Sequence, residues 1–253
     1  MRHRVLLLLI WLIATVHLPL APARAGETTV AVASNFISVL EPLAEDFQLM
    51  TGNTLIVISG STGKMFAQIM NGAPIDVLLA ADQERPEKLI ELDVGMAESR
   101  FTYAIGRLVL WSPDPGLIYG PDILNTDGFS FLAIANPELA PYGKAAQQAL
   151  QSLKSWPLVE DKIVRGENIS QTFAMVATGN ADLGFVAASL LNDVKYRDVG
   201  SRWMVPEELH EPIRQDAVLL AYGMQNPTAR EFLAYLKTDR AKTIIHKHGY
   251  GAE

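Results

Sequence analysis

The chain has 253 residues, a formal net charge of −7 and no cysteine. A net acidic chain is a poor candidate for binding nucleic acid or anionic lipid, and without cysteine it can form neither a disulfide nor a lipid-modified N-terminal cysteine. Its length exceeds the usual single-core domain of about 100–150 residues, so we expect two lobes.

The first 25 residues have the pattern of a secretory signal peptide. Arg2 and Arg4 form a basic start, residues 5–14 are an apolar core, and Ala23-Arg24-Ala25 is a small-x-small cleavage site. A membrane anchor is the alternative, but the apolar run is shorter than the roughly 20 residues that span a bilayer. We therefore expect export to the periplasm with cleavage after Ala25. The lack of a cysteine for a lipid anchor favours a Gram-negative source.

The mature chain begins with strand-like runs that alternate with amphipathic segments. Residues 29–33, 55–58 and 77–81 are predicted strands, and residues 36–47 and 65–70 have apolar positions at helical spacing. This order favours a parallel sheet with helices on both faces. Pro42 removes a backbone donor within the first helical segment, so we expect a kink there or a helix that restarts at Glu41.

A second unit repeats this order further along the chain. Its predicted strands are residues 131–135, 162–164 and 183–186, and its predicted helices are residues 142–153 and 171–177. Helical patterns also occur at residues 232–236 and 241–245. No short-period repeat or low-complexity tract separates the two units.

Two further strand-like runs, residues 103–111 and 216–221, are placed to carry the chain into a second lobe and back. We therefore expect lobe I to comprise residues 26–106 with 218–253, and lobe II to comprise residues 107–217. Two crossings of this kind form a hinge, and the cleft between the lobes is the expected ligand site.

The turn Ser59-Gly60-Ser61-Thr62-Gly63-Lys64 joins a predicted strand to a predicted helix. Backbone N–H groups converge at the positive end of a helix dipole in such a turn, which makes an anion site. A nucleotide-binding phosphate loop needs a glycine where Ile58 stands and a Ser or Thr where Met65 stands. The turn therefore predicts a bound anion but not a nucleotide.

Further short motifs follow the same order as a known family over nearly the whole mature chain. They are Ala33-Ser34-Asn35-Phe36, Gly60-Ser61-Thr62-Gly63-Lys64, Asn71-Gly72-Ala73-Pro74-Ile75-Asp76-Val77, Ala80-Ala81-Asp82-Gln83, Asn136-Pro137-Glu138, Pro141-Tyr142-Gly143, Ala181-Asp182-Leu183-Gly184-Phe185-Val186 and Tyr235-Leu236-Lys237. Together they resemble the molybdate-binding periplasmic proteins of ABC importers.

This resemblance implies an α/β chain with the two-lobed type II periplasmic binding-protein fold. In that fold two mixed, mostly parallel sheets are flanked by helices and joined by two hinge strands. The resemblance also implies a monomer without a cofactor that is not an enzyme. Such a protein captures molybdate, and also tungstate, and delivers it to a membrane permease with a cytoplasmic ATPase.

Carried over position by position, the resemblance also implies a set of anion-binding residues. They are Ser34, Asn35, Ser61, Thr62, Tyr142 and, through its backbone N–H, Ile169. Many relatives have a tyrosine at the end of the later strand, where this chain has Ala187. Tyr142 looks like the substitute donor that a subgroup of the family uses.

The chemistry of the implied ligand agrees with these residue types. Molybdate at neutral pH is a fully deprotonated tetrahedral dianion, so it only accepts hydrogen bonds and a selective site needs donors alone. Hydrogen phosphate also donates a proton, and Glu167 is the only acid near these loops that could accept it. Sulfate is a proton-free dianion that only cavity size could exclude. A binding protein for sulfate or another small oxyanion therefore stays an open alternative.

Ordinary structural roles are open for several of the same residues. Ser34, Thr62 and Ser170 could each be a helix N-cap, because Ser and Thr often cap helices. Lys64 is expected to point outward, since a donor-only site for this dianion does not require a basic side chain.

An exported hydrolase is the alternative of a different class. The chain has no Gly-x-Ser-x-Gly elbow and no cysteine, and its mature histidines lie outside the anion loops. His246 and His248 have the spacing of a metal-binding pair, but no third ligand accompanies them. We expect this pair at a solvated helix end.

Overall fold

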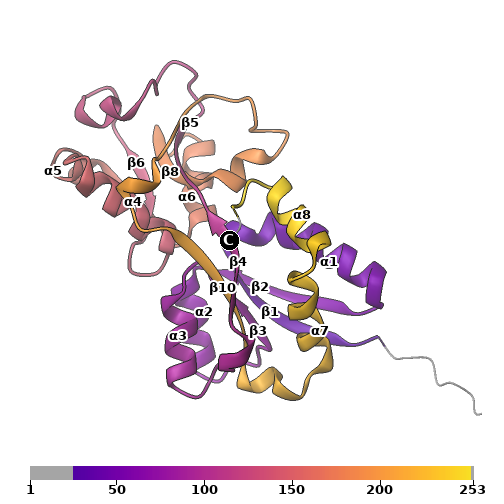
Figure 1. Cartoon of the computed structure of the whole chain (residues 1–253). Helices are drawn as coiled ribbons and strands as arrows, with labels where there is room; N and C mark the ends of the chain where they lie inside the picture. Colours follow the sequence, from indigo (N-terminus) through magenta and orange to yellow (C-terminus); the bar gives the residue numbers. More distant parts are fainter. Residues whose placement is uncertain (1–24, 252–253) are drawn as a thin grey trace, which may run out of the picture.

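Two lobes, each built on its own five-stranded sheet, make up the folded chain (Figure 1). The structure is a computed structural model that describes residues 25–251. The predicted signal peptide therefore lies outside the described residues, apart from Ala25. Among the residues described, no helix combines the length and apolar character needed to cross a membrane.

The first sheet has the strand order β2-β1-β3-β10-β4. Its strands are β1 (Glu27–Ala33), β2 (Thr54–Gly60), β3 (Val77–Leu79), β4 (Phe101–Gly106) and β10 (Ile213–Leu219). β1 pairs in parallel with β2 and β3, whereas β10 pairs antiparallel with β3 and β4. This lobe is therefore discontinuous in sequence, because β10 inserts into a sheet whose other strands all precede residue 107.

The second sheet has the strand order β7-β6-β8-β5-β9. Its strands are β5 (Leu108–Ser112), β6 (Leu132–Ala135), β7 (Ile163–Gly166), β8 (Leu183–Ala187) and β9 (Ser201–Met204). β6 pairs in parallel with β7 and β8, and β5 pairs antiparallel with β8 and β9. The prediction of two mixed sheets is confirmed, although parallel pairings equal antiparallel ones in number and do not outnumber them. The reason is that β5 and β10, which lie next to the two crossings between the lobes, run antiparallel to the strands with which they pair.

Helices cover both sheets. The α-helices are α1 (Ile37–Thr51), α2 (Thr62–Met70), α3 (Glu84–Glu91), α4 (Pro141–Ser152), α5 (Trp156–Val159), α6 (Ile169–Ala177), α7 (Pro227–Leu236) and α8 (Asp239–Lys247). The 3₁₀ helices are η1 (Ser34–Phe36), η2 (Ala97–Ser99), η3 (Pro121–Asn125), η4 (Glu160–Lys162), η5 (Ala188–Asn192), η6 (Glu207–Leu209) and η7 (Ala221–Gln225).

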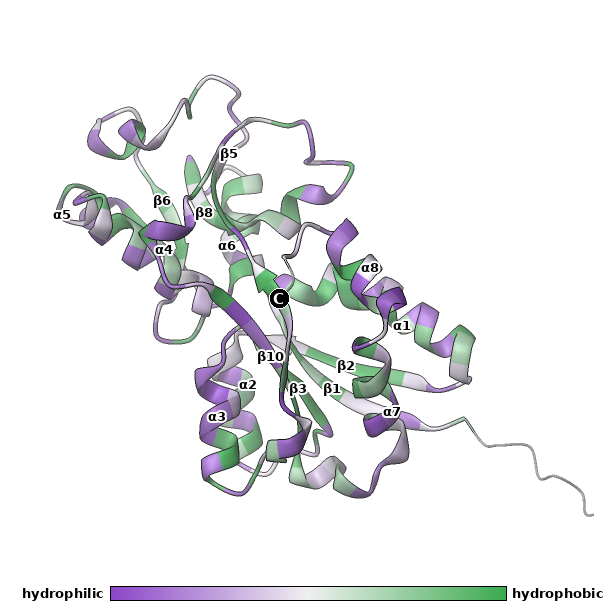
Figure 2. Cartoon of the chain, viewed as in Figure 1, coloured by the Kyte–Doolittle hydropathy of each residue, from purple (hydrophilic) through white to green (hydrophobic). Residues whose placement is uncertain are grey.

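The central strands are apolar on both faces, as strands covered by helices on both sides must be (Figure 2). In β1, Val30 and Val32 pack with Phe47 of α1, while Ala31 between them packs on the other face with Met65 of α2. Successive side chains of a strand point to opposite faces, so one strand contributes to two apolar clusters. β5 shows the same alternation in the second sheet.

Helix α1 continues through Pro42, so it does not restart at Glu41, which was one of the two predicted alternatives. The N–H group that proline lacks would have bonded to the carbonyl of Ser38, four residues earlier. Ser38 is exposed, and water can therefore satisfy its carbonyl.

The predicted long strand at residues 103–111 is in fact two strands in different sheets. β4 belongs to the first sheet and β5 to the second, so Arg107 between them carries the chain across. The chain returns through residues 205–212, and β10 is the long orange strand below this return in Figure 1. The division into lobes at residues 107 and 218 stays a prediction. Since β10 begins at Ile213, its pairing favours a second boundary before residue 218.

Candidate functional site

All six residues implied as anion ligands line one small cavity between the lobes. Ser34, Asn35, Ser61 and Thr62 come from the first lobe, and Tyr142 and Ile169 come from the second. The cavity holds about 180 Å³ of empty space, part of it open to solvent, and is completed by Ala33, Gly60, Ala81, Ala140 and Pro141. None of the lining residues is charged, and the six implied ligands are only 1% to 6% exposed.

The pairing of parallel strands brings these loops together. β1 ends at Ala33, which is paired with Gly60 at the end of β2. β6 ends at Ala135, which is paired in the same way with Gly166 at the end of β7. Parallel strands have their carboxyl ends at one edge of the sheet, where α/β folds bind ligands. The two edges face each other across the cavity.

Three helices begin at the cavity wall. α2 begins at Thr62 after the N-cap Ser61, whose side chain accepts from the N–H of Lys64 at 3.4 Å. α6 begins at Ile169 after the N-cap Asn168. α4 begins at Pro141 without a side-chain cap. First-turn N–H groups have no i−4 partner within their own helix, and several of them, such as those of Gly63 and Ser170, bond to other residues here. The N–H groups of the first helical residues, Thr62 and Ile169, are the ones placed to serve an anion in the cavity.

The capping alternative is therefore wrong for Thr62 and Ser170, because each lies inside its helix, one or two residues beyond the N-cap. Ser34 is the first residue of the short helix η1, and no side chain caps that helix. The side-chain caps belong to Ser61 and Asn168 instead. Ser61 combines both roles, since it caps α2 and also lines the cavity.

The hydroxyl of Thr62 is fixed by a bond that leaves its proton available. Thr62 Oγ1 accepts a hydrogen bond from the backbone N–H of Ala81 at 3.0 Å. A hydroxyl carries one donor proton and two acceptor lone pairs. With one lone pair bound to Ala81, the proton of Thr62 remains free to donate into the cavity.

Ser34 already makes contacts with the second lobe. Its hydroxyl lies 3.2 Å from Asn168 Oδ1, to which it donates, and it accepts from the N–H of Ser170 at 3.4 Å. The hydroxyl of Ser170 in turn donates to the carbonyl of Ser34 at 3.0 Å. The start of η1 therefore packs directly against the start of α6.

The side chain of Asn35 points away from the cavity into a buried polar cluster. Its Nδ2 donates to Gln215 Oε1 at 2.9 Å and to Tyr250 Oη at 2.8 Å. Tyr250 Oη donates to the backbone carbonyl of Asn35 at 2.8 Å. Asn35 can therefore serve an anion only through its backbone N–H.

Tyr142 is almost fully buried at the base of α4. Burial, together with the neighbouring phenols of Tyr250 and Tyr103, raises the pKa of Tyr142 well above its ordinary value. The phenol therefore keeps its proton and can act as a donor. Ala187, where many relatives have a tyrosine, is buried at the end of β8.

Sequence reasoning missed the polar cluster behind the cavity. Gln215, Tyr103 and Tyr250 are at most 7% exposed and surround Asn35 and Tyr142. The only signal in the sequence is a glutamine immediately before the strand-like run 216–221.

Contacts outside the cavity hold the two lobes together in a closed arrangement. The N–H of Gly63 donates to the carbonyl of Leu139 at 2.9 Å, and Arg85 Nη2 donates to the carbonyl of Glu138 at 2.7 Å. Lys64 pairs with Glu167 of the other lobe at 2.8 Å, and both side chains are half-exposed. Lys64 thus lies at the rim of the cleft and does not line the cavity.

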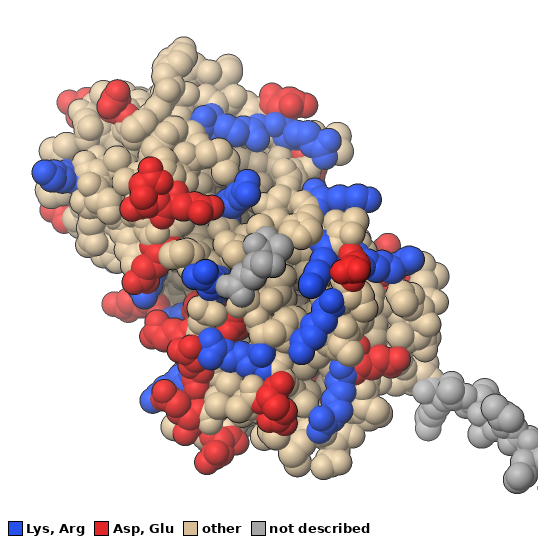
Figure 3. All heavy atoms as spheres, in the orientation of Figure 1, with Lys and Arg blue, Asp and Glu red and all other residues tan. Residues whose placement is uncertain are grey.

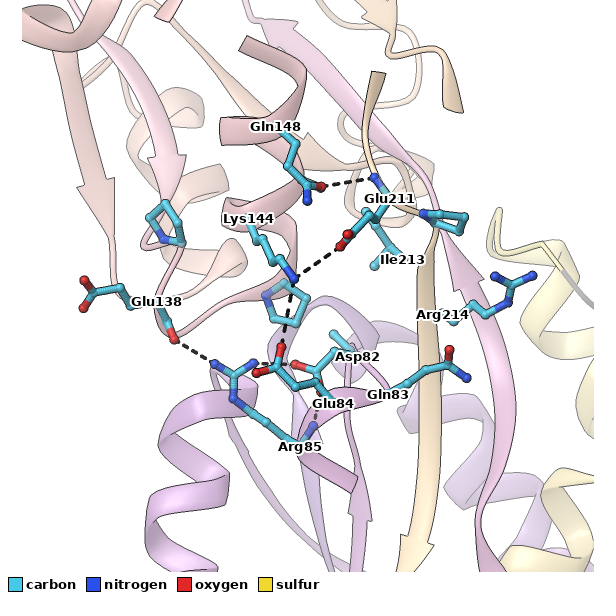
Figure 4. Close-up of a pocket in the computed structure, with 15 residues that line it drawn as sticks. Asp82, Gln83, Glu84, Arg85, Glu138, Lys144, Gln148, Glu211, Ile213 and Arg214 are labelled. Atoms are coloured by element: carbon cyan, nitrogen blue, oxygen red, sulfur yellow. Dashed lines mark hydrogen bonds and ion pairs between the residues drawn. The ribbon is translucent and has the colours of Figure 1, made fainter. Parts of the chain in front are cut away.

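A larger hollow lies beside this cavity and shares Ala81 and Pro141 with it (Figure 4). It has a volume of about 1070 Å³, part of it open to solvent. Lys144 lies between Glu84 and Glu211 there, at 4.0 and 3.2 Å. None of the six implied ligands lines this hollow, whose charged side chains are of both signs.

The charged side chains on the face drawn in Figure 3 are of both signs, and both kinds occur on each lobe. Within residues 25–251, no group of three or more His, Asp or Glu side chains is arranged to hold a metal ion. The Nδ1 atoms of His246 and His248 lie 3.1 and 2.8 Å from backbone carbonyls.

Two α/β lobes, joined by two crossings around a buried cavity lined with donors, define a two-lobed solute-binding protein. Residues 28–251 match the family of bacterial extracellular solute-binding proteins, and the chain belongs to that family. The fold and the family resemblance inferred from the motifs are therefore confirmed.

Individual relatives narrow this class further. The molybdate-binding protein ModA of Azotobacter vinelandii is 46% identical over 91% of this chain and 92% of its own length. ModA of Rhodobacter capsulatus is 44% identical over 92% of this chain and 91% of its own length. The solved structure of the Azotobacter vinelandii periplasmic molybdate-binding protein has a TM-score of 0.86, with 39% identity, and covers 89% of this chain and 99% of that one.

Proposed function

We propose that this chain binds molybdate, and also tungstate, in the cavity between its lobes. It would deliver the anion to an ABC permease with a cytoplasmic ATPase, as a periplasmic monomer cleaved after Ala25. The observation that carries the proposal is a buried cavity, lined from both lobes, in which no side chain is charged. Two relatives that match over nine-tenths of this chain and are named as molybdate-binding support the same ligand.

The proposed ligands are all hydrogen-bond donors. They are the hydroxyls of Ser61 and Thr62, the phenol of Tyr142, the backbone N–H groups of Asn35 and Ile169, and the hydroxyl of Ser34, whose single proton must turn from Asn168 Oδ1 to the anion. About six charge-assisted bonds at ~1.5–3 kcal/mol each contribute roughly 10–15 kcal/mol before the cost of dehydrating the dianion. Since both lobes contribute donors, the anion binds the closed form better and shifts the hinge toward it.

The lack of an acceptor disfavours hydrogen phosphate. That anion carries a proton which must itself find an acceptor, and an unmatched proton among buried donors is costly. Glu167 is the acid that could have served, but it pairs with Lys64 at the rim. We therefore expect phosphate to bind much more weakly than a proton-free dianion.

Sulfate is the alternative ligand, because it has the same charge and also only accepts hydrogen bonds. The two anions differ in size, since Mo–O bonds are longer than S–O bonds. Discrimination must therefore come from the fit of a cavity of about 180 Å³.

Isothermal titration calorimetry on residues 26–253 tests the ligand. Molybdate and tungstate are expected to bind with one site per chain, and sulfate and phosphate at least about 100-fold more weakly. Tight sulfate binding without molybdate binding would give the chain the alternative function. A chain that binds none of the four anions would contradict the proposal as a whole.

Delivery is a separate part of the proposal and needs its own test. Cells that lack the gene are expected to lose molybdate uptake at low external concentration, and the wild-type gene is expected to restore it. A variant that does not bind the anion, such as Thr62→Val combined with Tyr142→Phe, serves as the control. Unchanged uptake in the deletion strain would argue for a sensing role in place of transport.

A further inference from the structure

Gln215 lies directly behind the anion cavity and contacts residues of both lobes. It is fully buried on β10, at an irregularity in the pairing of β10 with β4. Its Oε1 accepts from Asn35 Nδ2 at 2.9 Å and from Tyr103 Oη at 3.2 Å. Its Nε2 donates to Tyr142 Oη at 3.3 Å. The side chain thus joins one proposed ligand residue from each lobe.

The direction of these bonds follows from one phenol. Tyr250 Oη donates its only proton to the backbone carbonyl of Asn35, so it must accept from the side chain of Asn35. Asn35 therefore presents its NH₂ group, which also contacts Gln215. Gln215 must then present its oxygen to Asn35 and its NH₂ group to Tyr142. This chain of bonds makes the Tyr142 hydroxyl an acceptor on the side that faces away from the cavity.

We infer that Gln215 is a positioning residue that makes the Tyr142 phenol a donor toward the bound anion. This inference rests on the proposed function. Because Tyr142 accepts from Gln215, its own proton is free to point into the cavity, as the proton of Thr62 does. Tyr250 is the competing acceptor for this proton, because its hydroxyl, which accepts from Asn35, also interacts with the Tyr142 phenol. A dianion in the cavity is the stronger acceptor and draws the proton toward itself. The direction of the hydrogen bond from Gln215 to Tyr142 also makes the phenol a poor acceptor for a protonated anion.

Gly106 provides a second observation at the same place. It is the last residue of β4, immediately before the first crossing. A Cβ at this position would lie 2.2 Å from Tyr142 Oη and 2.8 Å from Gln215 Nε2. The Tyr142 hydroxyl and the Gln215 amide therefore occupy space at the hinge that is open only because residue 106 has no side chain. Tyr142 belongs to the second lobe and Gln215 to a strand of the first sheet, so their bond forms where the lobes join.

A double-mutant cycle with molybdate tests the inference. Gln215→Met and Tyr142→Phe are each expected to weaken molybdate binding about tenfold in calorimetry. The double variant is expected to bind no more weakly than Tyr142→Phe alone, because Gln215 acts through the phenol. Gln215→Glu is a second, nearly isosteric variant. Its carboxylate accepts the phenol proton and also repels the dianion, so it should weaken binding more than Gln215→Met, and in the Tyr142→Phe background only the repulsion should remain.

Two controls separate positioning from folding. Gln48→Met changes an exposed glutamine on α1 and is expected to leave the affinity unchanged. Gly106→Ala places a Cβ against both the Tyr142 hydroxyl and Gln215 Nε2, so it disturbs their bond from the hinge side and is expected to weaken molybdate binding as well. Thermal unfolding without anion shows that each variant is folded.

The outcomes distinguish this inference from the proposed function. A wild-type chain that binds no oxyanion overturns both. A wild-type chain that binds molybdate, with losses from Gln215→Met and Tyr142→Phe that simply add, overturns only the positioning role.

Discussion

Replacing Thr62 by valine removes one donor from the cavity and almost preserves its shape. Thr62 is 1% exposed, and its hydroxyl accepts from the N–H of Ala81 while it is free to donate to the anion. The variant therefore loses two bonds with different consequences. The lost bond to the dianion is expected to weaken binding by ~1–3 kcal/mol, which is about 5- to 150-fold.

The second loss affects folding and not binding. Without the hydroxyl, the N–H of Ala81 is buried with no acceptor, which costs roughly 1–3 kcal/mol of unfolding free energy even when no anion is present. Calorimetric titration with molybdate measures the first effect, and urea unfolding of the anion-free chain measures the second. Thr62→Ser is the matched control, because it keeps the hydroxyl and should bind within a few-fold of the wild type.

The two measurements together can refute the reasoning. A Thr62→Val variant that unfolds more easily but binds molybdate like the wild type would show that the hydroxyl serves Ala81 alone. The donor role of Thr62 would then be wrong, whatever the affinity of the wild-type chain.

Three further predictions concern the Lys64–Glu167 pair at the rim of the cleft, the Asp46–Arg240 ion pair and the close packing at Gly143. Lys64→Ala breaks the half-exposed pair with Glu167 and is expected to weaken molybdate binding by less than about fivefold; calorimetry at two salt concentrations should show the loss shrinking at high salt. The side chain of Arg240 lowers the pKa of Asp46 in the folded chain below the value of about 4 expected in the unfolded chain. The pair therefore contributes its full stability above a pH of about 4. This contribution disappears as the pH falls through the lowered pKa of the folded chain. Asp46→Asn should therefore reduce the unfolding free energy at pH 7, and its difference from the wild type in urea unfolding should narrow toward pH 3; a constant difference would contradict the linkage. Gly143→Ala places a Cβ 2.1 Å from a carbonyl oxygen of β6 and should cost ~1–3 kcal/mol, seen as a lower Tm in scanning calorimetry, whereas an unchanged Tm would argue against this close packing.

Local patterns predicted most of the elements correctly, because burial on both faces leaves a strong apolar signal in short strands. The division of the predicted strand 103–111 into two strands at Arg107 was missed for the same reason. The apolar run on both sides of it is nearly continuous, although β4 and β5 belong to different sheets. Periodicity reports burial, and it does not report which sheet buries a residue.

The candidate site was likewise predicted only where its residues are close together in the sequence. Ser61 and Thr62 follow one strand and open one helix, so adjacent residues were enough to predict an anion site there. Which of the two caps the helix depends on a one-residue shift that a sequence pattern does not resolve. Gln215 bonds to Asn35 across 180 residues, and such a contact leaves no mark in any short window.

The burial of the cavity has a consequence for the time that an anion stays bound. Its proposed ligands are at most 6% exposed, so an anion can leave only when the lobes separate. Contacts such as the bond from Gly63 to Leu139 oppose that separation without touching the anion. They therefore lengthen residence for any anion that fits. If the anion is delivered to a permease as proposed, the permease would release it by separating the lobes and would not need to contact the anion itself.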